Sequence, residues 1–157
     1  MTVLGRLKAD DRPWETEGDP QVTAGENPSA ATHPCLRRAD FAAFEALAAD
    51  QRLSQKLLDR SSGADRVAVS LIRTPAGQGS PEGLHTHEFE QVFYVLSGEM
   101  NIEIDGAVFR APTGSLVRFE EGVPHRNWND DDGPDSLHLA VNVPAPSAGQ
   151  PLAKPVR

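Results

Sequence analysis

Three histidines and a glutamine are spaced as metal ligands on neighbouring β-strands would be. His85 and His87 lie two positions apart, and Gln91 follows four positions after His87. On an extended strand, residues of equal parity point to the same face, so these side chains can share one interior. On an α-helix the two imidazoles would diverge by roughly 200° and could not chelate one ion. His125, after the turn sequence Glu-Gly-Val-Pro, can add a third imidazole from another strand and leave coordination positions open.

The residues around these ligands distinguish a metal site from solvated loop histidines, which is the commoner meaning of an isolated His-x-His pair. They form two strings, Gly79-x5-His85-x-His87-x3-Gln91-x6-Gly98 and Gly114-x5-Glu120-x-Gly122-x2-His125-x3-Asn129. The strings resemble the two sequence motifs of the cupin superfamily, G-x5-HxH-x3,4-E-x6-G and G-x5-PxG-x2-H-x3-N. The resemblance covers roughly residues 60–145.

The resemblance implies a fold and a ligand set. The implied fold is all-β, a cupin double-stranded β-helix (jelly-roll barrel), here with a short N-terminal helix. His85, His87 and His125 are then the implied metal ligands, and Gln91 is a candidate fourth. The implied cofactor is one divalent transition metal per subunit: Fe, Zn, Ni, Cu or Mn.

Two positions depart from the motifs. Glu120 replaces a proline at a solvent-side turn, where the change has little chemical meaning. Gln91 replaces the usual glutamate at a ligand position. An amide oxygen can bind the ion directly, and the neutral set then leaves the metal its full +2 charge. In the other interpretation, Gln91 hydrogen-bonds a ligand histidine or a metal-bound water.

Short apolar or alternating segments predict the strands that must position these ligands. They cover residues 53–57, 66–73, 90–96, 100–104, 107–110, 116–119 and 137–143. Asp105-Gly106 is a two-residue hairpin turn. Strands separated by turn signals at intervals of roughly 8–12 residues predict a sandwich or barrel. One helix is expected, capped by Asp40 and ending near Asp50.

The chain divides into three segments by composition. Residues 1–39 form an irregular N-terminal arm, and residues 40–143 form a single domain with the helix at its start. The barrel itself occupies about 60–143. Residues 144–157 are a proline-rich tail that cannot be helix or central strand for long. Either end can be disordered or can pack across a partner subunit.

His138 is a further candidate for chemistry. It shares one face of its predicted strand with Ala140 and Asn142. The other face carries Leu137, Leu139, Val141 and Val143, and we expect that apolar set to pack between the sheets. His138 is then a structural residue, or a catalytic acid or base, or an additional metal ligand.

Apolar residues near the ligands are candidates for the substrate pocket. They are Phe89, Phe93, Val95, Met100 and Trp128. For each residue alone, ordinary sandwich core is the competing interpretation. Some of them must line a cavity, because ligands and apolar residues share a strand face.

Composition narrows the function class. The 157 residues include 15 basic and 23 acidic side chains, a formal charge of −8, which disfavours binding to nucleic acid. No apolar run approaches the ~18 residues of a membrane span, and no signal peptide is evident. The single cysteine, Cys35, cannot form an internal disulfide. We therefore expect a cytoplasmic protein that binds a small-molecule substrate, without nucleic-acid or membrane partners, as a homodimer.

Three functions fit these features. The first is dioxygenase-type oxidation of a small, oxygen-rich organic substrate at the three-histidine metal centre. The second is non-redox Lewis-acid catalysis by a cyclase or isomerase on a polyketide-like substrate. The third is a non-catalytic cupin that binds a small molecule.

Overall fold

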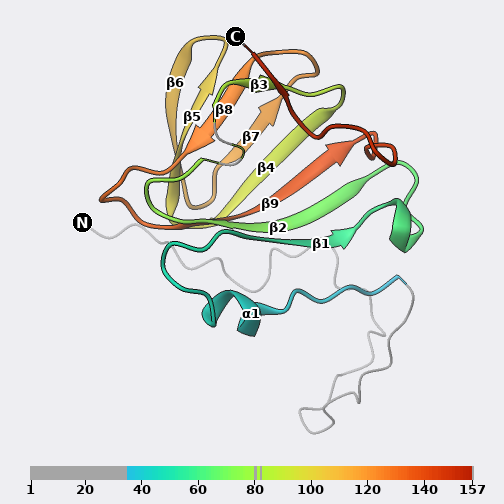
Figure 1. The fold of residues 1–157 in the computed structure, drawn as a ribbon, viewed down its shortest axis with the longest axis horizontal. Helices are drawn as coiled ribbons and strands as arrows, with labels where there is room; N and C mark the ends of the chain where they lie inside the picture. The colour runs from blue at the N-terminus through green and yellow to red at the C-terminus, as the bar shows by residue number, and fades with distance from the viewer. Residues whose placement is uncertain (1–34, 80, 82, 157) are drawn as a thin grey trace, which may run out of the picture. The chain divides into compact units, whose positions relative to one another are not determined.

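The computed structural model describes residues 35–79, 81 and 83–156, which form two antiparallel β-sheets (Figure 1). The first sheet has the order β1 (Leu53–Leu58), β2 (Ala68–Thr74), β9 (Ser136–Val143), β4 (Glu90–Ser97) and β7 (Leu116–Phe119). The second has the order β10 (Lys154–Pro155), β3 (His85–Thr86), β8 (His125–Trp128), β5 (Glu99–Ile104) and β6 (Ala107–Pro112). The helices are α1 (Phe41–Glu45) and the short 3-10 helix η1 (Arg60–Ser62). Across this part of the chain, no helix is long and apolar enough to cross a membrane.

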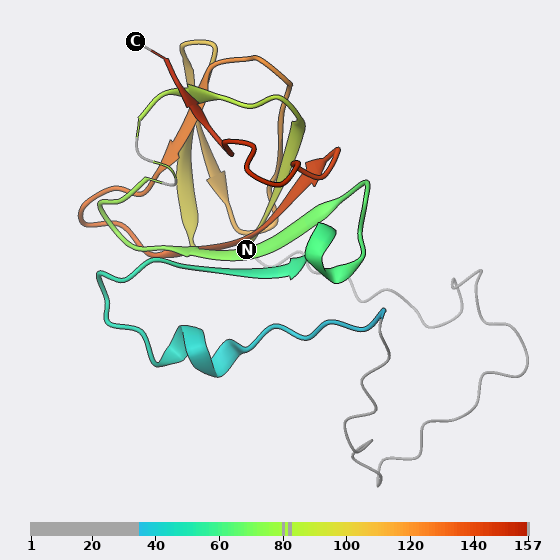
Figure 2. The same ribbon diagram turned by 45° about the vertical axis from the view of Figure 1, so that its right-hand side comes forward.

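The strands lie where the residue pattern predicts them, and so does the hairpin turn between β5 and β6. Asp105 and Gly106 have φ angles of 49° and 79°. Two consecutive residues with positive φ give the turn whose twist matches that of the flanking strands. Both sheets extend beyond the expected barrel, because β1 precedes residue 60 and β10 follows residue 143. Figure 2 shows the chain after β9 crossing back to the second sheet.

Alternation along β4 separates the core from the outer surface. Gln91, Phe93 and Val95 are buried, whereas Tyr94 and Leu96 are exposed. Eight of the buried apolar residues form one cluster between the sheets: Ile72, Phe93, Val95, Met100, Ile102, Ala111, Phe119 and Ala140. The parity predicted for the ligand-bearing segment is therefore confirmed.

The expected inward face of β9 is wrong. Ser136, His138 and Ala140 are buried, whereas Leu137, Leu139 and Val141 are half-buried on the outer face. The register explains the reversal, because His138 pairs with inward-facing residues of β2 and β4. Leu139 instead pairs with Leu71 of β2 and Tyr94 of β4 on the outer face. The apolar residues on one face of this strand therefore did not identify the face that packs in the core.

The helix α1 begins as predicted but ends earlier. The Asp40 carboxylate accepts a hydrogen bond from Ala43 N, as an N-cap residue does. The helix stops at Glu45 rather than near Asp50. After the helix, the Arg73 guanidinium of β2 binds the carbonyl groups of residues 48, 49 and 51 and also pairs with Asp135.

Candidate metal centre and its cavity

Three buried imidazoles converge between β3 and β8. His85 and His125 are opposite each other in the register of these strands, and His87 comes just after β3. A ring nitrogen from each of the three lies within 4.8 Å of the others. The exposed fractions are 3%, 5% and 2% for His85, His87 and His125. The structure thus brings together the three histidines that the spacing selected.

Backbone carbonyls fix the orientation of all three rings. Nδ1 of His85 lies 3.0 Å from the Gly83 oxygen, and Nδ1 of His125 lies 2.8 Å from the Val123 oxygen. Nδ1 of His87 bonds the Leu152 oxygen of the C-terminal segment. A carbonyl only accepts, so each Nδ1 carries the proton and each Nε2 keeps its lone pair. This is the tautomer that a ligand histidine needs.

Burial also keeps these rings neutral. Desolvation lowers the pKa of His85 and His87, and it lowers the pKa of His125 to about 4. Imidazole binds a metal only when it is neutral. Near pH 7 the three rings are therefore ready to bind a cation without first losing protons.

Gln91 on β4 reaches the same point from the other sheet. Its amide nitrogen donates to Asn142 Oδ1 at 2.8 Å, which turns Oε1 toward His87 Nε2 at 3.2 Å. With Nδ1 of His87 protonated, both of these atoms are acceptors, and they face each other without a proton between them. Nε2 of His125 is buried without any hydrogen-bond partner. A divalent cation among these atoms would satisfy all of them, so the donor set fits the implied metal.

A cavity of about 370 Å³ lies beside this cluster. Its lining residues are Arg52, Ser54, Lys56, Ser70, Ile72, Gly79, Pro81, His87, Phe89, Gln91, Phe93, Ala140, Asn142, Leu152 and Ala153. Phe89 stacks on the His87 ring with centroids 4.7 Å apart. The site is therefore open to a small molecule next to His87 and Gln91, with an apolar wall from Phe89 and Phe93.

The five residues predicted to line the pocket lie in different places. Phe89 and Phe93 line the cavity, as expected. Val95 and Met100 are members of the core cluster. Trp128 lies outside the cavity, under the guanidinium of Arg126 at 4.6 Å from its ring centroid.

His138 lies in the core and does not line the cavity. It is fully buried, its ring centroid is 4.3 Å from that of Phe93, and neither ring nitrogen has a hydrogen-bond partner. Burial lowers its pKa to about 3, so the ring is neutral near pH 7. Phe93 lines the cavity and contacts this ring. The role of His138 as an acid or base stays a prediction.

Two parts of the site were not expected from the sequence. Arg52, Ser54 and Lys56 reach the cavity from β1, before the expected barrel. Their alternation with Leu53 and Leu57 was the available signal. The role of the Leu152 carbonyl could not have been predicted in this way, because every residue type has a backbone carbonyl.

Acid should destabilise the metal-free protein through its buried histidines. Above pH 6.5 these imidazoles are neutral in both the native and the unfolded chain. As the pH falls below 6.5, these histidines bind protons in the unfolded chain. In the native protein, His125 does not bind its proton until about pH 4, and His138 not until about pH 3. We expect the free energy of unfolding to fall over this range by about 1.4 kcal/mol per pH unit for each proton.

Urea denaturation at several pH values between 7.5 and 4 measures this slope. The variant His138→Leu removes one of the four buried histidines whose pKa is lowered. Its slope should be shallower than that of the wild type by about one proton. Equal slopes would show that His138 does not titrate as its burial requires.

This chain matches one family model and is similar to several solved structures. Residues 70–141 match the family model described as "Cupin domain". The polyketide cyclase RemF from Streptomyces resistomycificus is 26% identical over 68% of this chain and 71% of its own, with a TM-score of 0.54. A cupin protein from Bacteroides fragilis is 29% identical over 65% and 83%, with a TM-score of 0.50. KdgF from Halomonas sp. is 18% identical over 62% and 82%, with a TM-score of 0.54. A search of curated protein sequences gives no match.

Proposed function

Because this chain is a member of the cupin superfamily, we propose that it is a metal-dependent enzyme for a small, oxygen-rich organic substrate. His85, His87 and His125 would hold one divalent transition metal, with Gln91 as the fourth ligand. The observation that carries the proposal is the convergence of three buried imidazoles beside an open cavity. A purely structural metal site would be closed by side chains on all sides.

The neutral donor set favours Lewis-acid chemistry. A divalent ion held by three imidazoles and an amide keeps its full +2 charge, and it would polarise a carbonyl or enolate oxygen of the substrate. Asn142 holds the Gln91 amide in place through the bond to its nitrogen. Phe89 and Phe93 form the apolar wall against which a planar substrate would pack and exclude water.

The cavity offers few groups for proton transfer. Among its described lining residues there is no aspartate or glutamate, and His87 is committed to the ligand set. Activation of the substrate must then come mainly from the charge at the ligand cluster. This favours cyclisation or isomerisation of a polyketide-like substrate, and the similarity to the cyclase RemF supports the same choice.

Dioxygenase-type oxidation is the second candidate. Three neutral imidazoles also suit a redox-active ion such as iron, which needs coordination positions for both substrate and oxygen. The cavity beside His87 gives room for them. The two candidates differ in the metal and in oxygen consumption.

Metal analysis of the protein purified without a His-tag tests the proposal. Bound zinc, with no oxygen uptake while a poly-β-ketone probe cyclises, would support the Lewis-acid enzyme. Bound iron with stoichiometric oxygen uptake would support the dioxygenase instead. A protein that binds no divalent metal stoichiometrically would contradict both candidates.

Replacement of Gln91 tests its place in the ligand set. Gln91→Ala should lower the affinity for Zn²⁺ by more than the roughly 100-fold that loss of a residue outside direct contact can cost, and Gln91→Glu should retain the metal and bind it more tightly. The reason is that a carboxylate adds charge where the amide adds only a dipole. Competition with a chromogenic chelator measures both affinities, with the exposed Gln51, outside the cavity lining, changed to alanine as the control. Unchanged affinity in Gln91→Ala would move Gln91 out of direct contact with the metal.

A further inference from the structure

One of the three ligand histidines is oriented by a distant part of the chain. For His85 and His125, the carbonyl oxygen that holds the ring lies only two positions earlier. For His87, the carbonyl belongs to Leu152, which is 65 positions later. The orientation of His87 as a ligand therefore depends on how firmly the C-terminal segment is attached to the rest of the domain.

Residues 147–156 form a C-terminal strap that is attached to the domain at both ends. Just before its first residue, Arg60 donates hydrogen bonds of 3.1 and 3.2 Å to two successive backbone carbonyls. At its other end, β10 pairs with the two residues of β3, and Val156 N donates to the oxygen of the residue before β3 at 2.9 Å. The bond between His87 and Leu152 lies between these two attachments.

These attachments allow the strap to open while the rest of the domain stays folded. None of the described residues from 147 to 156 is buried, so the strap has no side chain anchored in the core. The ion pair between Lys154 and Glu88 joins side chains that are 51% and 54% exposed, and such surface pairs contribute little. Segments with few buried contacts open locally at a small cost in free energy. We therefore expect an equilibrium between an attached and an open strap in the metal-free protein.

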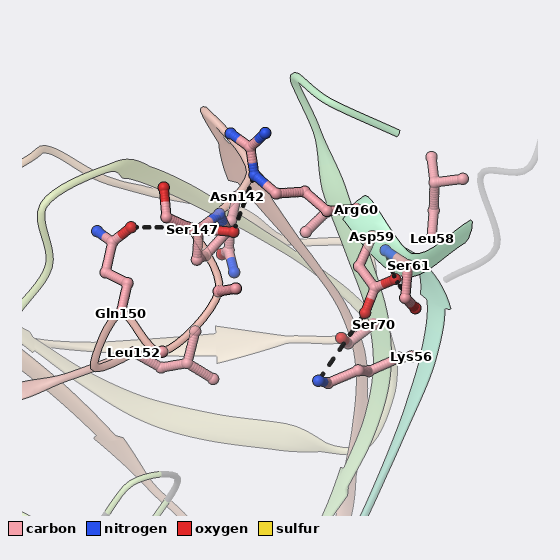
Figure 3. Close-up of a pocket in the computed structure, with 14 residues that line it drawn as sticks. Lys56, Leu58, Asp59, Arg60, Ser61, Ser70, Asn142, Ser147, Gln150 and Leu152 are labelled. Atoms are coloured by element: carbon pink, nitrogen blue, oxygen red, sulfur yellow. Dashed lines mark hydrogen bonds and ion pairs between the residues drawn. The ribbon is translucent and has the colours of Figure 1, made fainter. Parts of the chain in front are cut away.

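The strap also forms part of the cavity wall. Leu152 and Ala153 line the cavity beside His87. Leu152 and residues 146–150 also line a second pocket of about 310 Å³, in which they lie opposite Lys56 of β1 (Figure 3). Opening of the strap would remove this wall, so the substrate cavity is complete only while the strap is attached.

We propose that the strap positions His87 for the metal, and that a bound divalent cation in turn holds the strap in place. This inference rests on the proposed metal site. A cation at Nε2 of His87 withdraws electron density from the ring, which makes the Nδ1–H group a stronger donor to the Leu152 carbonyl. Because coupling between two equilibria is reciprocal, the factor by which the cation disfavours opening equals the factor by which opening weakens cation binding. Closure of the substrate cavity is thus linked to occupancy of the metal centre.

Amide hydrogen exchange of the full chain, with and without saturating Zn²⁺, measures the opening of the strap. Zn²⁺ should slow exchange of the Val156 amide by about 10- to 100-fold, which is the effect on metal affinity of a partner that orients a ligand. The Ala46 amide is the internal control, because it bonds the Ala42 oxygen at 3.0 Å at the end of α1, outside the ligand cluster. Its exchange rate should be the same in both samples.

The double variant Lys154→Glu/Val156→Pro should open the strap and leave every candidate ligand unchanged. The first substitution places a like charge opposite Glu88, and the second removes the amide that bonds the residue before β3. We expect the affinity for Zn²⁺, measured with a chromogenic chelator, to fall by about 10- to 100-fold. Added negative charge would by itself favour a cation, so a loss of affinity assigns the effect to the strap. Lys154→Arg/Val156→Ala keeps the cation and the amide, and this matched control should bind as the wild type does.

The outcomes separate this inference from the proposed function. If Lys154→Glu/Val156→Pro binds Zn²⁺ with wild-type affinity, or if Zn²⁺ slows the Val156 and Ala46 amides equally, the role of the strap is overturned and the metal site stands. An equal loss of affinity in Lys154→Arg/Val156→Ala would also overturn it, because that variant keeps both attachments. A wild-type protein that binds no Zn²⁺ stoichiometrically would overturn the proposed function, and the inference falls with it.

Discussion

Replacement of His125 by alanine is expected to lower the affinity for Zn²⁺ by more than about 100-fold. Loss of residues that merely orient metal ligands already costs 10- to 100-fold. His125 contributes the only imidazole from β8, and its Nε2 has no other partner. The two remaining histidines, His85 and His87, come from one short segment and cannot surround an ion alone.

Thermal unfolding gives a second measure of the same loss. Zinc at about 100 times its Kd should stabilise the wild-type protein by about 2.7 kcal/mol, because only the native chain presents the site. His125→Ala should lose this stabilisation. The control His138→Leu also removes one buried histidine, yet it lies outside the cluster and should keep the zinc response. A zinc response retained in His125→Ala would refute the three-histidine site.

Gly98→Ala is expected to lower the free energy of unfolding by about 3 kcal/mol or more. Gly98 joins β4 to β5 with a φ of +73°, and a Cβ there would lie 1.9 Å from the Asp135 carbonyl oxygen. The left-handed conformation costs an L-residue roughly 1–2 kcal/mol, and overpacking adds typically 1–3 kcal/mol. Asp135 cannot move away easily, because its carboxylate binds Arg73 and Ala76 N.

Gly114→Ala separates these two contributions. Gly114 also has a positive φ, +88°, but a Cβ there would meet nothing within 4 Å. Its substitution should cost only the roughly 1–2 kcal/mol of backbone strain. Urea denaturation measures both variants. Equal losses of unfolding free energy in the two variants would show that the contact with Asp135 does not contribute to the destabilisation.

The parts of the site that follow from local spacing could be predicted from the sequence. The two-residue period of a strand places Gln91, Phe93 and Val95 on one face of β4, whatever the rest of the fold does. The turn at Asp105 is equally local, because the residue types that tolerate positive φ are few. These predictions needed no knowledge of which strands pair.

The parts that depend on pairing between distant strands could not be predicted. The inward face of β9 is set by its register with β2 and β4, and both of its faces carry residues that suit burial. Arg52 and Lys56 line the cavity only because β1 pairs with β2. The Leu152 carbonyl reaches His87 only because β10 pairs with β3. Local patterns specify which residues share a face of a strand, but they do not specify which other parts of the protein that face contacts.

The central place of β9 in the first sheet has a consequence for how the protein folds. His138 pairs with Ile72 and Val95, which are 66 and 43 positions earlier in the chain. The sheet cannot close until these long loops have lost their conformational freedom, and only then do the pairings contribute stability. Refolding is therefore expected in the millisecond-to-second range typical of all-β domains, far slower than a helical bundle. Until β9 inserts, the apolar inner faces of β2 and β4 are exposed to other chains, so yield on refolding should fall as protein concentration rises.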